Sequence, residues 1–504
     1  MIAERIATRE VIVGPPGTGK TTTLVKMVKD LIDGGLPPER IGYFTFSRAA
    51  IKEALGRLEL GKQPWWSTIH AAGYKLLKEH GLVKAGRFVT RRLATARFPS
   101  YSEILFPDDQ SGLIDIYSLM KSNQIDSTEI FNRSSSFPEI ALEDWLQWVI
   151  DYEAWKKREG LVDYSDCIDL ALGCPGPDLD CMLIDESQDL GKSEIKLIEH
   201  WFTCRQVIVG DDDQTIYRFI GADPNWMIKQ AKDWPTTVLE QSRRVPILPF
   251  NLAQKIVSKI SNRIEKVYRP KPEPGMVRLI SIDEIPEIAA PLAKEGKTVA
   301  ILVRTRWQAD RVNQVFADQH VPTNDMSGSR SSMHFKKSRK LFRIWRDLTY
   351  PRPKGYGTIR GKDCLLVWRQ YDNLEGCCPN TDPYTGDFKM CTRGYPGNQD
   401  EGRYLFDIDT EKCPWIKPGL TEAYQKWGAY EDWPLQVMTM HQSKGRQFDC
   451  VFLIPDITRR VSEAMDQSQE ALDDEHRLFY VAATRTKDRL YTVLPSTKRF
   501  YVIP

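Results

Sequence analysis

The chain has 504 residues, of which 41% are hydrophobic and 27% charged, and its formal net charge is only +2. The composition is that of an ordinary folded protein, and the length suggests roughly three or four domains. The sequence has no run of about 18 apolar residues, which excludes a membrane-spanning helix, and the small net charge means that any nucleic-acid surface must be local. Ten cysteines without regular spacing, and an N-terminus that does not resemble a signal peptide, favour a reducing, cytoplasmic location.

The first candidate site is the glycine-rich segment Gly14–Thr21, which reads GPPGTGKT. The β-branched run Glu10–Val13 predicts a buried strand before it, and the apolar spacing of Thr22–Ile32 predicts a helix after it. In that context G-x-x-x-x-G-K-[ST] binds phosphate, because backbone N–H groups and the positive end of the helix surround the anion. We therefore predict a nucleotide site formed by Gly14, Pro15, Pro16, Gly17, Thr18, Gly19, Lys20, Thr21 and Thr22.

The next segments alternate between strand-like and helix-like patterns. Ile41–Phe46 predicts a second strand, and Ala49–Leu58 predicts a helix after it. From about residue 81 to residue 160 the pattern is mostly helical, which indicates an inserted domain. Its tryptophans Trp145, Trp148 and Trp155 recur at helical spacing, so we interpret them as core rather than as DNA contacts.

Two carboxylates follow the apolar run Cys181–Ile184, which predicts a strand. Asp185 is placed to bind Mg²⁺ together with the Thr21 hydroxyl, and Lys20 can reach the β and γ phosphates of the nucleotide. Glu186 is placed to polarise the attacking water as general base. This pair gains its meaning from the phosphate loop upstream, because an isolated Asp-Glu pair is weak support for a site.

A sensor is predicted where the next strand, Gln206–Val209, leads into Asp-Asp-Asp and Gln214. A glutamine at a strand end beside the γ-phosphate can report whether that phosphate is present. The aromatic residues Tyr217 and Phe219 follow at once and could hold a base. This adjacency is what coupling hydrolysis to a grip on DNA requires.

In the second half of the chain, Val299–Val303 predicts a strand and Trp307–His320 a helix. Ser327–Lys362 contains eleven Lys or Arg, one acidic residue and interleaved aromatic side chains. This stretch is either a nucleic-acid surface or an amphipathic helix, Lys336–Leu348, packed on a neighbour. The segment beyond it has weak periodicity, and the paired spacing of a zinc site is absent from its cysteines, Cys377, Cys378, Cys391 and Cys413.

These motifs, in this order, resemble those of the UvrD/Rep-type superfamily 1 DNA helicases. The resemblance covers nearly the whole chain, in a compact form with a reduced second insertion domain. Beyond the phosphate loop it is carried by Thr45–Arg48, Thr68–His70, Leu161–Asp166, Asp185–Asp189, Gly210–Ala222, Leu239–Val245, Ala300–Arg311, Met438–Phe448 and Glu475–Thr486.

The resemblance implies an ATP-dependent DNA helicase that moves along single-stranded DNA in the 3′→5′ direction, with ATP and Mg²⁺. Its arginine fingers would be Arg244 and Arg485, which supply charge to the γ-phosphate across a cleft between two domains and complete a catalytic set with Lys20, Glu186 and Gln214. Gln447 would contact the nucleotide, at a position where the family often has a glutamate, and Arg243 replaces an adenine-stacking tyrosine. The DNA contacts would be Phe46, His70, Tyr217, Phe219, Arg304, Thr439 and His441.

The fold implied is α/β, with two RecA-like P-loop NTPase domains built on parallel sheets. Residues 1–63 with 163–245 would form the first domain, and 64–162 its helical insertion. Residues 246–350 with 431–504 would form the second domain, and 351–430 a small irregular insertion. That insertion is shorter than is typical of the family, which suggests an unregulated motor or one that needs a protein partner there.

The last residues of the sequence predict a hairpin formed by Arg489–Leu494 and Arg499–Ile503. This hairpin could split the duplex at a single-strand/double-strand junction, with Tyr491 or Phe500 as the wedge. It could equally be a plain edge hairpin.

Two functions remain as alternatives to a helicase. One is a translocase that strips proteins from single-stranded DNA without unwinding, and the other is a DNA-binding subunit of a nuclease complex.

Overall fold

The computed structural model describes residues 7–504 except 47, 85–86, 106–111, 134–139, 203, 320, 322 and 328–433. The chain forms two compact units. Unit 1 comprises Met1–Pro274, Glu463–Thr484 and Pro504, and unit 2 comprises Gly275–Ser462 and Arg485–Ile503. Each unit is built on a six-stranded sheet in which every pairing is parallel, so the predicted α/β class with two parallel sheets is confirmed.

The sheet of unit 1 has the order β3-β2-β4-β5-β1-β6. Because all strands run the same way, their carboxyl ends meet at one edge, which is where ligands bind in open sheets of this kind. The segments after β1, β4 and β5 therefore lie close together. The strands are β1 (Arg9–Val13), β2 (Ile41–Phe44), β3 (Trp66–Ser67), β4 (Cys181–Ile184), β5 (Arg205–Gly210) and β6 (Thr236–Val238).

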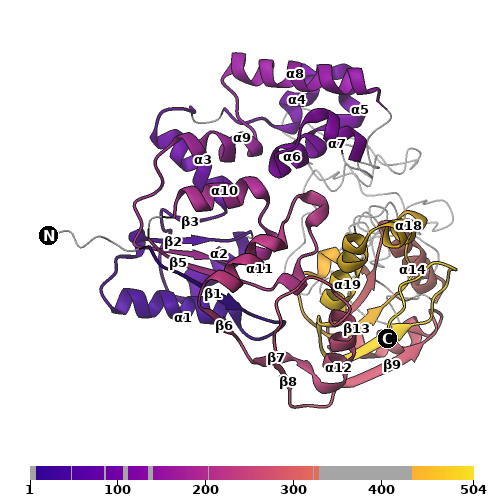
Figure 1. Ribbon diagram of the computed structural model, residues 1–504. Coiled ribbons are helices and arrows are strands. Elements are labelled where there is room, and N and C mark those ends of the chain that lie inside the picture. The colour runs from indigo at the N-terminus through magenta and orange to yellow at the C-terminus, as the bar shows by residue number, and fades with distance from the viewer. Residues whose placement is uncertain are drawn as a thin grey trace, which may run out of the picture. The chain divides into compact units, whose positions relative to one another are not determined.

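Helices cover both faces of this sheet, and each face packs on its helices through a separate apolar cluster (Figure 1). One face packs on α1 (Lys20–Asp33) and α2 (Arg48–Arg57). The other packs on α3 (Ile69–Glu79), α9 (Tyr164–Asp169), α10 (Lys192–His200) and α11 (Pro224–Asp233). Strand β3 thus belongs to the sheet and helix α3 to the layer that covers it, although both lie within the predicted 64–162 insertion. The division of the chain into four parts stays a prediction.

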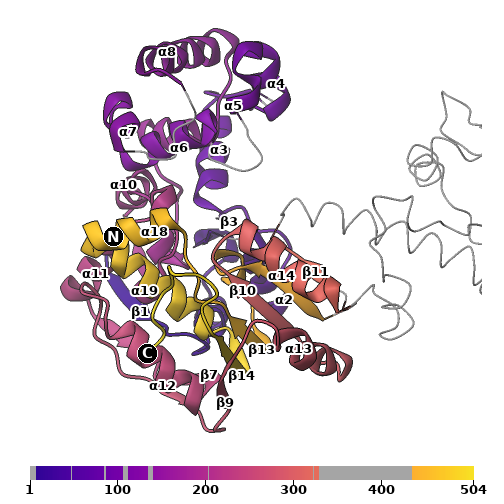
Figure 2. The same cartoon turned by 90° about the vertical axis from the view of Figure 1, so that its right-hand side faces the viewer.

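The remaining helices of the insertion form a layer with a core of its own (Figure 2). Helix α8 (Leu142–Glu159) carries Trp145, Trp148, Tyr152 and Trp155 on one side. All four are buried, which confirms the interpretation of these tryptophans as core. The Trp148 ring stacks on its neighbours, with centroids 5.6 Å from Trp145 and 5.0 Å from Tyr152. The helices are α4 (Arg91–Arg97), α5 (Ser102–Leu105), α6 (Leu113–Asn123), α7 (Ser127–Arg133) and α8 (Leu142–Glu159).

Unit 1 also contains elements that follow its sheet in the chain. Strand β7 (Gln241–Pro246) pairs in parallel with β8 (Arg269–Lys271), and α12 (Ile247–Val257) lies between them in sequence. Helix α19 (Gln469–Ala483) packs against α12 and against the short 3-10 turn η5 (Asp212–Gln214). A helix from the far end of the sequence therefore contacts the turn that carries the predicted sensor glutamine.

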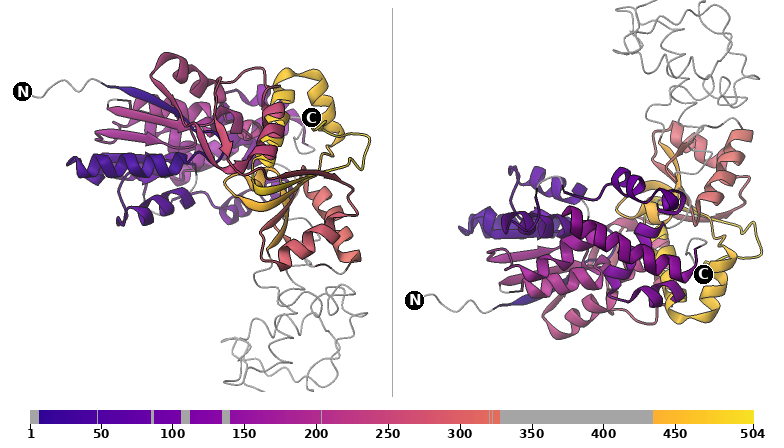
Figure 3. Two further views of the ribbon diagram at one scale, coloured as in Figure 1. Left: turned by 90° about the horizontal axis from the view of Figure 1, so that it is seen from below. Right: turned by 90° about the horizontal axis from the view of Figure 1, so that it is seen from above.

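The sheet of unit 2 has the order β11-β12-β10-β13-β14-β9. Helices α13 (Ile285–Lys294) and α14 (Arg306–Asp318) pack through one apolar cluster on a face of this sheet (Figure 3). Helix α18 (Arg459–Gln467) precedes α19 in the chain. The strands are β9 (Met276–Ile280), β10 (Val299–Val303), β11 (Asn324–Asp325), β12 (Leu435–Thr439), β13 (Phe448–Leu453) and β14 (Thr486–Val493).

The predicted C-terminal hairpin is wrong. Strand β14 pairs in parallel with β13 and β9 inside the sheet, and Tyr491 is buried with its ring stacked on Phe452, the centroids 4.4 Å apart. Phe500 instead forms an isolated antiparallel bridge with Asp456. An alternating apolar strand before a turn looks the same in sequence whether it ends a hairpin or crosses a parallel sheet.

Several predictions fall outside the described residues. They concern the basic and aromatic stretch beyond Ser327, the insertion at 351–430, and the four cysteines between 377 and 413. Among the residues that are described, no helix is both long and apolar enough to cross a membrane.

Candidate nucleotide site and nucleic-acid contacts

The glycine-rich loop leaves β1 at Val13 and enters α1 at Lys20. Its start is anchored to the sheet, because the Gly14 N–H donates to the Gly210 carbonyl at 2.8 Å. Gly17 and Gly19 have φ of 76° and 91°, a left-handed conformation that favours glycine. The loop therefore wraps around the N-terminus of a 14-residue helix, where free N–H groups and the helix dipole favour an anion.

Two glycines of the loop are required by close neighbours. A Cβ on Gly14 would lie 2.1 Å from Cγ of Lys20, and a Cβ on Gly17 would lie 2.4 Å from Cβ of Arg244. The loop is thus approached closely by two of the cations predicted to contact a phosphate. The Lys20 ammonium donates to the Gly14 carbonyl at 3.1 Å and lies 4.0 Å from Oε1 of Glu186.

Asp185 and Glu186 follow β4 directly. Asp185 is buried, accepts from the Tyr43 hydroxyl at 3.1 Å through Oδ2, and accepts from the Glu186 N–H at 2.9 Å through Oδ1. Burial and the charge of Glu186 raise the pKa of Asp185 to about 7, against the opposing effect of Lys20. Glu186 has φ of 53°, which is rare for a residue with a side chain and is typical of functional sites.

These residues fit a magnesium ion by the chemistry of their donors. Mg²⁺ prefers oxygen ligands, and the fixed carboxylate of Asp185 and the hydroxyl of Thr21 are both hard oxygen donors. Thr21 lies in the first turn of α1, next to the lysine that contacts the loop carbonyl. Asp185 and Thr21 would hold the ion, which when bound would supply positive charge beside the phosphates.

A hydrogen-bonded chain joins the predicted general base to the predicted sensor. Gln188, in the 3-10 turn η4 (Ser187–Asp189), donates from Nε2 to Oε2 of Glu186 at 2.6 Å. Its Oε1 accepts from the Asp211 N–H at 2.9 Å, and Asp211 Oδ2 accepts from Gln214 Nε2 at 2.7 Å. Gln188 was not among the predicted site residues, although it stands inside the Asp185–Asp189 motif.

Arg244 lies in unit 1, on β7 beside the phosphate loop. Two contacts hold β7 there: Ser242 Oγ donates to the Pro16 carbonyl at 2.7 Å, and the Arg243 N–H donates to the Gly17 carbonyl at 2.9 Å. Burial lowers the pKa of Arg244, and the charge of Glu186 opposes that effect. The structure thus brings together Lys20, Glu186 and Arg244 around one loop.

The predicted DNA contacts of unit 1 form two groups. Phe46 and Tyr217 stack with centroids 5.7 Å apart, and the rings of Tyr217 and Phe219 are 6.2 Å apart. Phe46 is 47% exposed and Phe219 61%, so both aromatic faces are open to a ligand. His70 contacts Glu194 at 3.2 Å.

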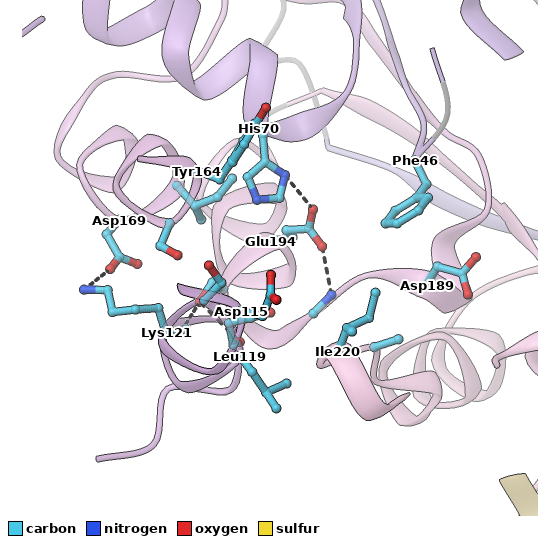
Figure 4. A pocket seen from close by; sticks show the side chains of 17 residues that line it. Phe46, His70, Asp115, Leu119, Lys121, Tyr164, Asp169, Asp189, Glu194 and Ile220 are labelled. Carbon is cyan, nitrogen blue, oxygen red and sulfur yellow. Dashed lines mark hydrogen bonds and ion pairs between the residues drawn. The ribbon is translucent and has the colours of Figure 1, made fainter. Parts of the chain in front are cut away.

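Phe46 and His70 both line a cavity of about 320 Å³ between the sheet domain and helix α6 (Figure 4). Tyr164 stands beside His70, with ring centroids 6.0 Å apart, and Ile220 lies on the side near Phe46. Burial opposes a charge on His70, but its bond to Glu194 outweighs that effect and raises its pKa. Tyr217 and Phe219 are not among the lining residues of the cavity.

The other predicted residues lie in unit 2. Arg304 follows β10 and Thr439 ends β12, and the two strands pair so that Val303 stands opposite Thr439. His441 comes directly after, in the turn η7 (His441–Ser443), and burial with the charges of Arg304 and Lys444 lowers its pKa to about 3. It is therefore a neutral imidazole at physiological pH.

Gln447 and Arg485 are brought near each other within unit 2 by a backbone contact. The N–H of Phe448, the residue after Gln447, donates to the Arg485 carbonyl at 2.9 Å. Gln447 is exposed and Arg485 is buried. The predicted site residues therefore fall into two sets, with the phosphate loop, the carboxylates, Gln214 and Arg244 in unit 1 and these two residues in unit 2.

Two protein-family models match this chain, one in its N-terminal part and one near its C-terminus. A family model described as an AAA domain (AAA_19) matches residues 2–220, and one described as a UvrD-like helicase C-terminal domain matches residues 426–497. The chain is 24% identical to the putative ATP-dependent DNA helicase YjcD of Bacillus subtilis (strain 168), with 96% of this chain and 76% of that protein covered.

Two further relatives give the same picture. DNA helicase II of Haemophilus influenzae is 23% identical, with 99% of this chain and 84% of that protein covered. The ATP-dependent DNA helicase PcrA of Leuconostoc citreum is 22% identical, and there the match spans 65% of this chain and 49% of the relative. The chain thus matches an AAA_19 domain and a UvrD-like helicase C-terminal domain, and it is homologous to UvrD/Rep-type superfamily 1 helicases.

Proposed function

We propose that the chain is an ATP-dependent DNA helicase that moves along single-stranded DNA in the 3′→5′ direction. The observation that carries the proposal is the arrangement in unit 1, where Lys20 and Glu186 are 4.0 Å apart and Arg244 lies against the same loop. Its relatives are named ATP-dependent DNA helicases, which supports ATP as the nucleotide and DNA as the polymer. The proposed location is the cytoplasm.

Hydrolysis would use the groups of unit 1 in distinct roles. The loop N–H groups and Lys20 bind the phosphates, and Glu186 accepts a proton from the attacking water. Arg244 supplies positive charge where the γ-phosphate develops it, and burial makes that charge more effective because the local dielectric is low. Gln214, tied to Asp211, would respond to the presence of the γ-phosphate.

Movement would come from a second arginine. Arg485 of unit 2 would approach the γ-phosphate when the two RecA-like domains close, and it would withdraw after hydrolysis. Single-stranded DNA would contact Phe46, His70, Tyr217 and Phe219 in unit 1 and Arg304, Thr439 and His441 in unit 2. A grip that differs between the two nucleotide states would then move the protein along the strand. Partners would be single-stranded DNA, its junctions with duplex, and a protein at the reduced insertion.

The experiment that tests this proposal is unwinding of duplexes with a single-stranded tail at either the 3′ or the 5′ end. With ATP we expect strand separation from the 3′-tailed substrate at least about tenfold faster than from the 5′-tailed one, a difference of about 1.4 kcal/mol in activation free energy. GTP in place of ATP tests base selection. Equal rates on both substrates would contradict the direction, and hydrolysis without strand separation would contradict unwinding.

A second candidate is a translocase that displaces proteins without separating strands. The observation that favours it is the position of Tyr491, which is buried in the sheet of unit 2 rather than on a duplex-splitting hairpin. Displacement of streptavidin from the 3′ or 5′ end of a biotinylated single strand, compared with unwinding by the same preparation, separates the two functions. Displacement alone would establish the second.

The DNA contacts in unit 2 make a prediction about salt. Arg304 offers a guanidinium that can pair with a phosphate, whereas His441 is neutral because burial and the charges of Arg304 and Lys444 lower its pKa to about 3. Changing Arg304→Gln should therefore flatten the plot of log affinity for single-stranded DNA against log salt by about 0.7, the value of one phosphate contact, while His441→Gln should leave its slope unchanged. Fluorescence anisotropy across a salt series measures both. Equal slopes for the Arg304 variant and the wild type would remove Arg304 from the DNA surface.

A further inference from the structure

Three consecutive carboxylates after β5 are buried around a single amine. The side chains of Asp211, Asp212, Asp213 and Lys266 are all 0% exposed. The Lys266 ammonium lies 3.0 Å from Asp211 Oδ1 and 3.0 Å from Asp213 Oδ2, and it also donates to Asp212. The three carboxylates lie within 4.8 Å of one another, as metal ligands do, but here the protein supplies the cation itself.

The segment 263–266, which carries Lys266, also supplies a partner to the second oxygen of Asp212 and of Asp213. Arg263 donates to both oxygens of Asp213, at 2.9 Å and 2.6 Å, and the Ile264 N–H donates to Asp212 Oδ2 at 2.8 Å. Each of the three carboxylates turns one oxygen to Lys266, and Asp211 differs in the partner of its second oxygen. Its other oxygen accepts from Gln214, the predicted sensor. Asp211 is thus the member of the cluster that reaches the nucleotide site.

From Asp211 the contacts continue to the general base. The Asp211 N–H donates to Gln188, and Gln188 donates to Glu186 at 2.6 Å. A chain of hydrogen bonds, buried except at its Glu186 end, therefore runs from Lys266 to the two groups that would contact the attacking water and the γ-phosphate. Chains of this kind in a low dielectric hold their members in fixed orientations.

The charges of the cluster depend on Lys266. Burial works against a charge on this lysine, but the three carboxylates outweigh it and raise its pKa. Burial and its neighbours Asp213 and Asp211 raise the pKa of Asp212 to about 6, while Lys266 opposes them. Removing the amine would leave carboxylates buried without their central partner, which is strongly unfavourable.

The segment that carries Lys266 also touches helix α19. The hydroxyls of Tyr268 and Tyr480 are 2.8 Å apart and buried. Tyr480 lies on the last turns of α19, five residues before Arg485. The cluster therefore stands between the sensor turn and the helix that leads to the predicted second arginine finger.

We propose that Lys266 is a positioning residue for ATP hydrolysis, which holds Asp211 so that Gln214, and through Gln188 also Glu186, keep the orientation that the reaction needs. The proposal rests on the proposed function, since it assigns Lys266 to the same site. Lys266 would not touch the nucleotide. Its loss should therefore change turnover rather than nucleotide binding.

A double-mutant cycle tests this role. Lys266→Met should lower kcat of DNA-stimulated ATP hydrolysis by about 10- to 100-fold, the usual scale for losing an outer support, while KM and the Kd of a fluorescent ADP stay within about twofold. Gln214→Ala should lower kcat similarly, and the double variant should be no worse than the poorer single variant, because both act through one unit. Lys255→Met, at an exposed lysine of α12, is the matched control and should keep wild-type kcat.

Multiplicative effects of the two changes, or a kcat of Lys266→Met within twofold of wild type, would overturn the proposal. If Lys266→Met does not fold, as judged by circular dichroism, the pair Lys266→Met with Asp212→Asn removes one charge of each sign and should show the same loss of kcat. If that double variant also does not fold, Asp211→Asn is the remaining test. Its amide NH₂ would face the donor of either Lys266 or Gln214 and break that hydrogen bond, so an unchanged kcat would overturn the proposal. Wild-type protein that hydrolyses no ATP would instead refute the proposed function.

Discussion

Replacing Lys20 by alanine is expected to lower DNA-stimulated ATP hydrolysis by at least about 10³-fold. The Lys20 ammonium already lies beside the Gly14 carbonyl and Glu186, so in the complex with nucleotide it would be the main charge on the β and γ phosphates. Affinity for single-stranded DNA without nucleotide should stay within about threefold, because none of the predicted DNA contacts lies on the loop. A coupled ATPase assay and fluorescence anisotropy measure the two quantities.

Lys29→Ala is the matched control, since Lys29 is exposed on the same helix, α1. It should hydrolyse ATP at the wild-type rate. Hydrolysis by Lys20→Ala at the rate of this control would refute the assignment of the phosphate site. If Lys20→Ala loses both DNA binding and ATP hydrolysis, the substitution has instead damaged the fold.

The second large effect is expected at Arg244. Arg244→Ala should lower kcat by about 10³- to 10⁵-fold, the range for an arginine that stabilises phosphoryl transfer, and should change KM for ATP far less. The physical reason is the position of Arg244. Its Cβ lies so close to the phosphate loop that no side chain would fit at position 17, and its guanidinium charge is partly buried. Steady-state kinetics over a range of ATP concentrations separates kcat from KM.

Arg243 offers an internal comparison one residue away. It is exposed, and its N–H contacts the Gly17 carbonyl, so Arg243→Ala keeps β7 against the loop. If Arg243 takes the adenine-stacking place that the family resemblance implies for this position, its loss should raise KM for ATP while kcat stays within about threefold. The reverse pattern, with kcat lost at Arg243 and kept at Arg244, would show that the finger has been assigned to the wrong arginine.

The sequence predicts the central strands of both sheets well. Cys181–Ile184 and Val299–Val303 are short, wholly apolar runs, and the structure has strands at those residues. Such runs are reliable because a strand buried on both faces tolerates few polar residues. The carboxylates after β4 could also be placed, since parallel topology brings the carboxyl end of that strand to the same edge as the phosphate loop.

Contacts between segments that lie far apart in the chain could not be predicted from the sequence. Gln188 bridges Glu186 and Asp211, and Lys266 lies more than fifty residues after the carboxylates that surround it. A lysine in a segment of mixed charge is normally expected at the surface, and only tertiary structure shows that it is buried. The C-terminal hairpin failed for a related reason, because the pattern of β14 does not say which strands are its neighbours.

The most direct test of coupled movement is stopped-flow translocation on single-stranded oligonucleotides of increasing length, each labelled at its 5′ or its 3′ end. We predict that, with ATP, the time at which a 5′-end label responds grows in proportion to length, that a 3′-end label shows no such lag, and that Lys20→Ala abolishes the lag. A response time that is independent of length at both ends, in wild-type protein that hydrolyses ATP, would contradict movement along DNA.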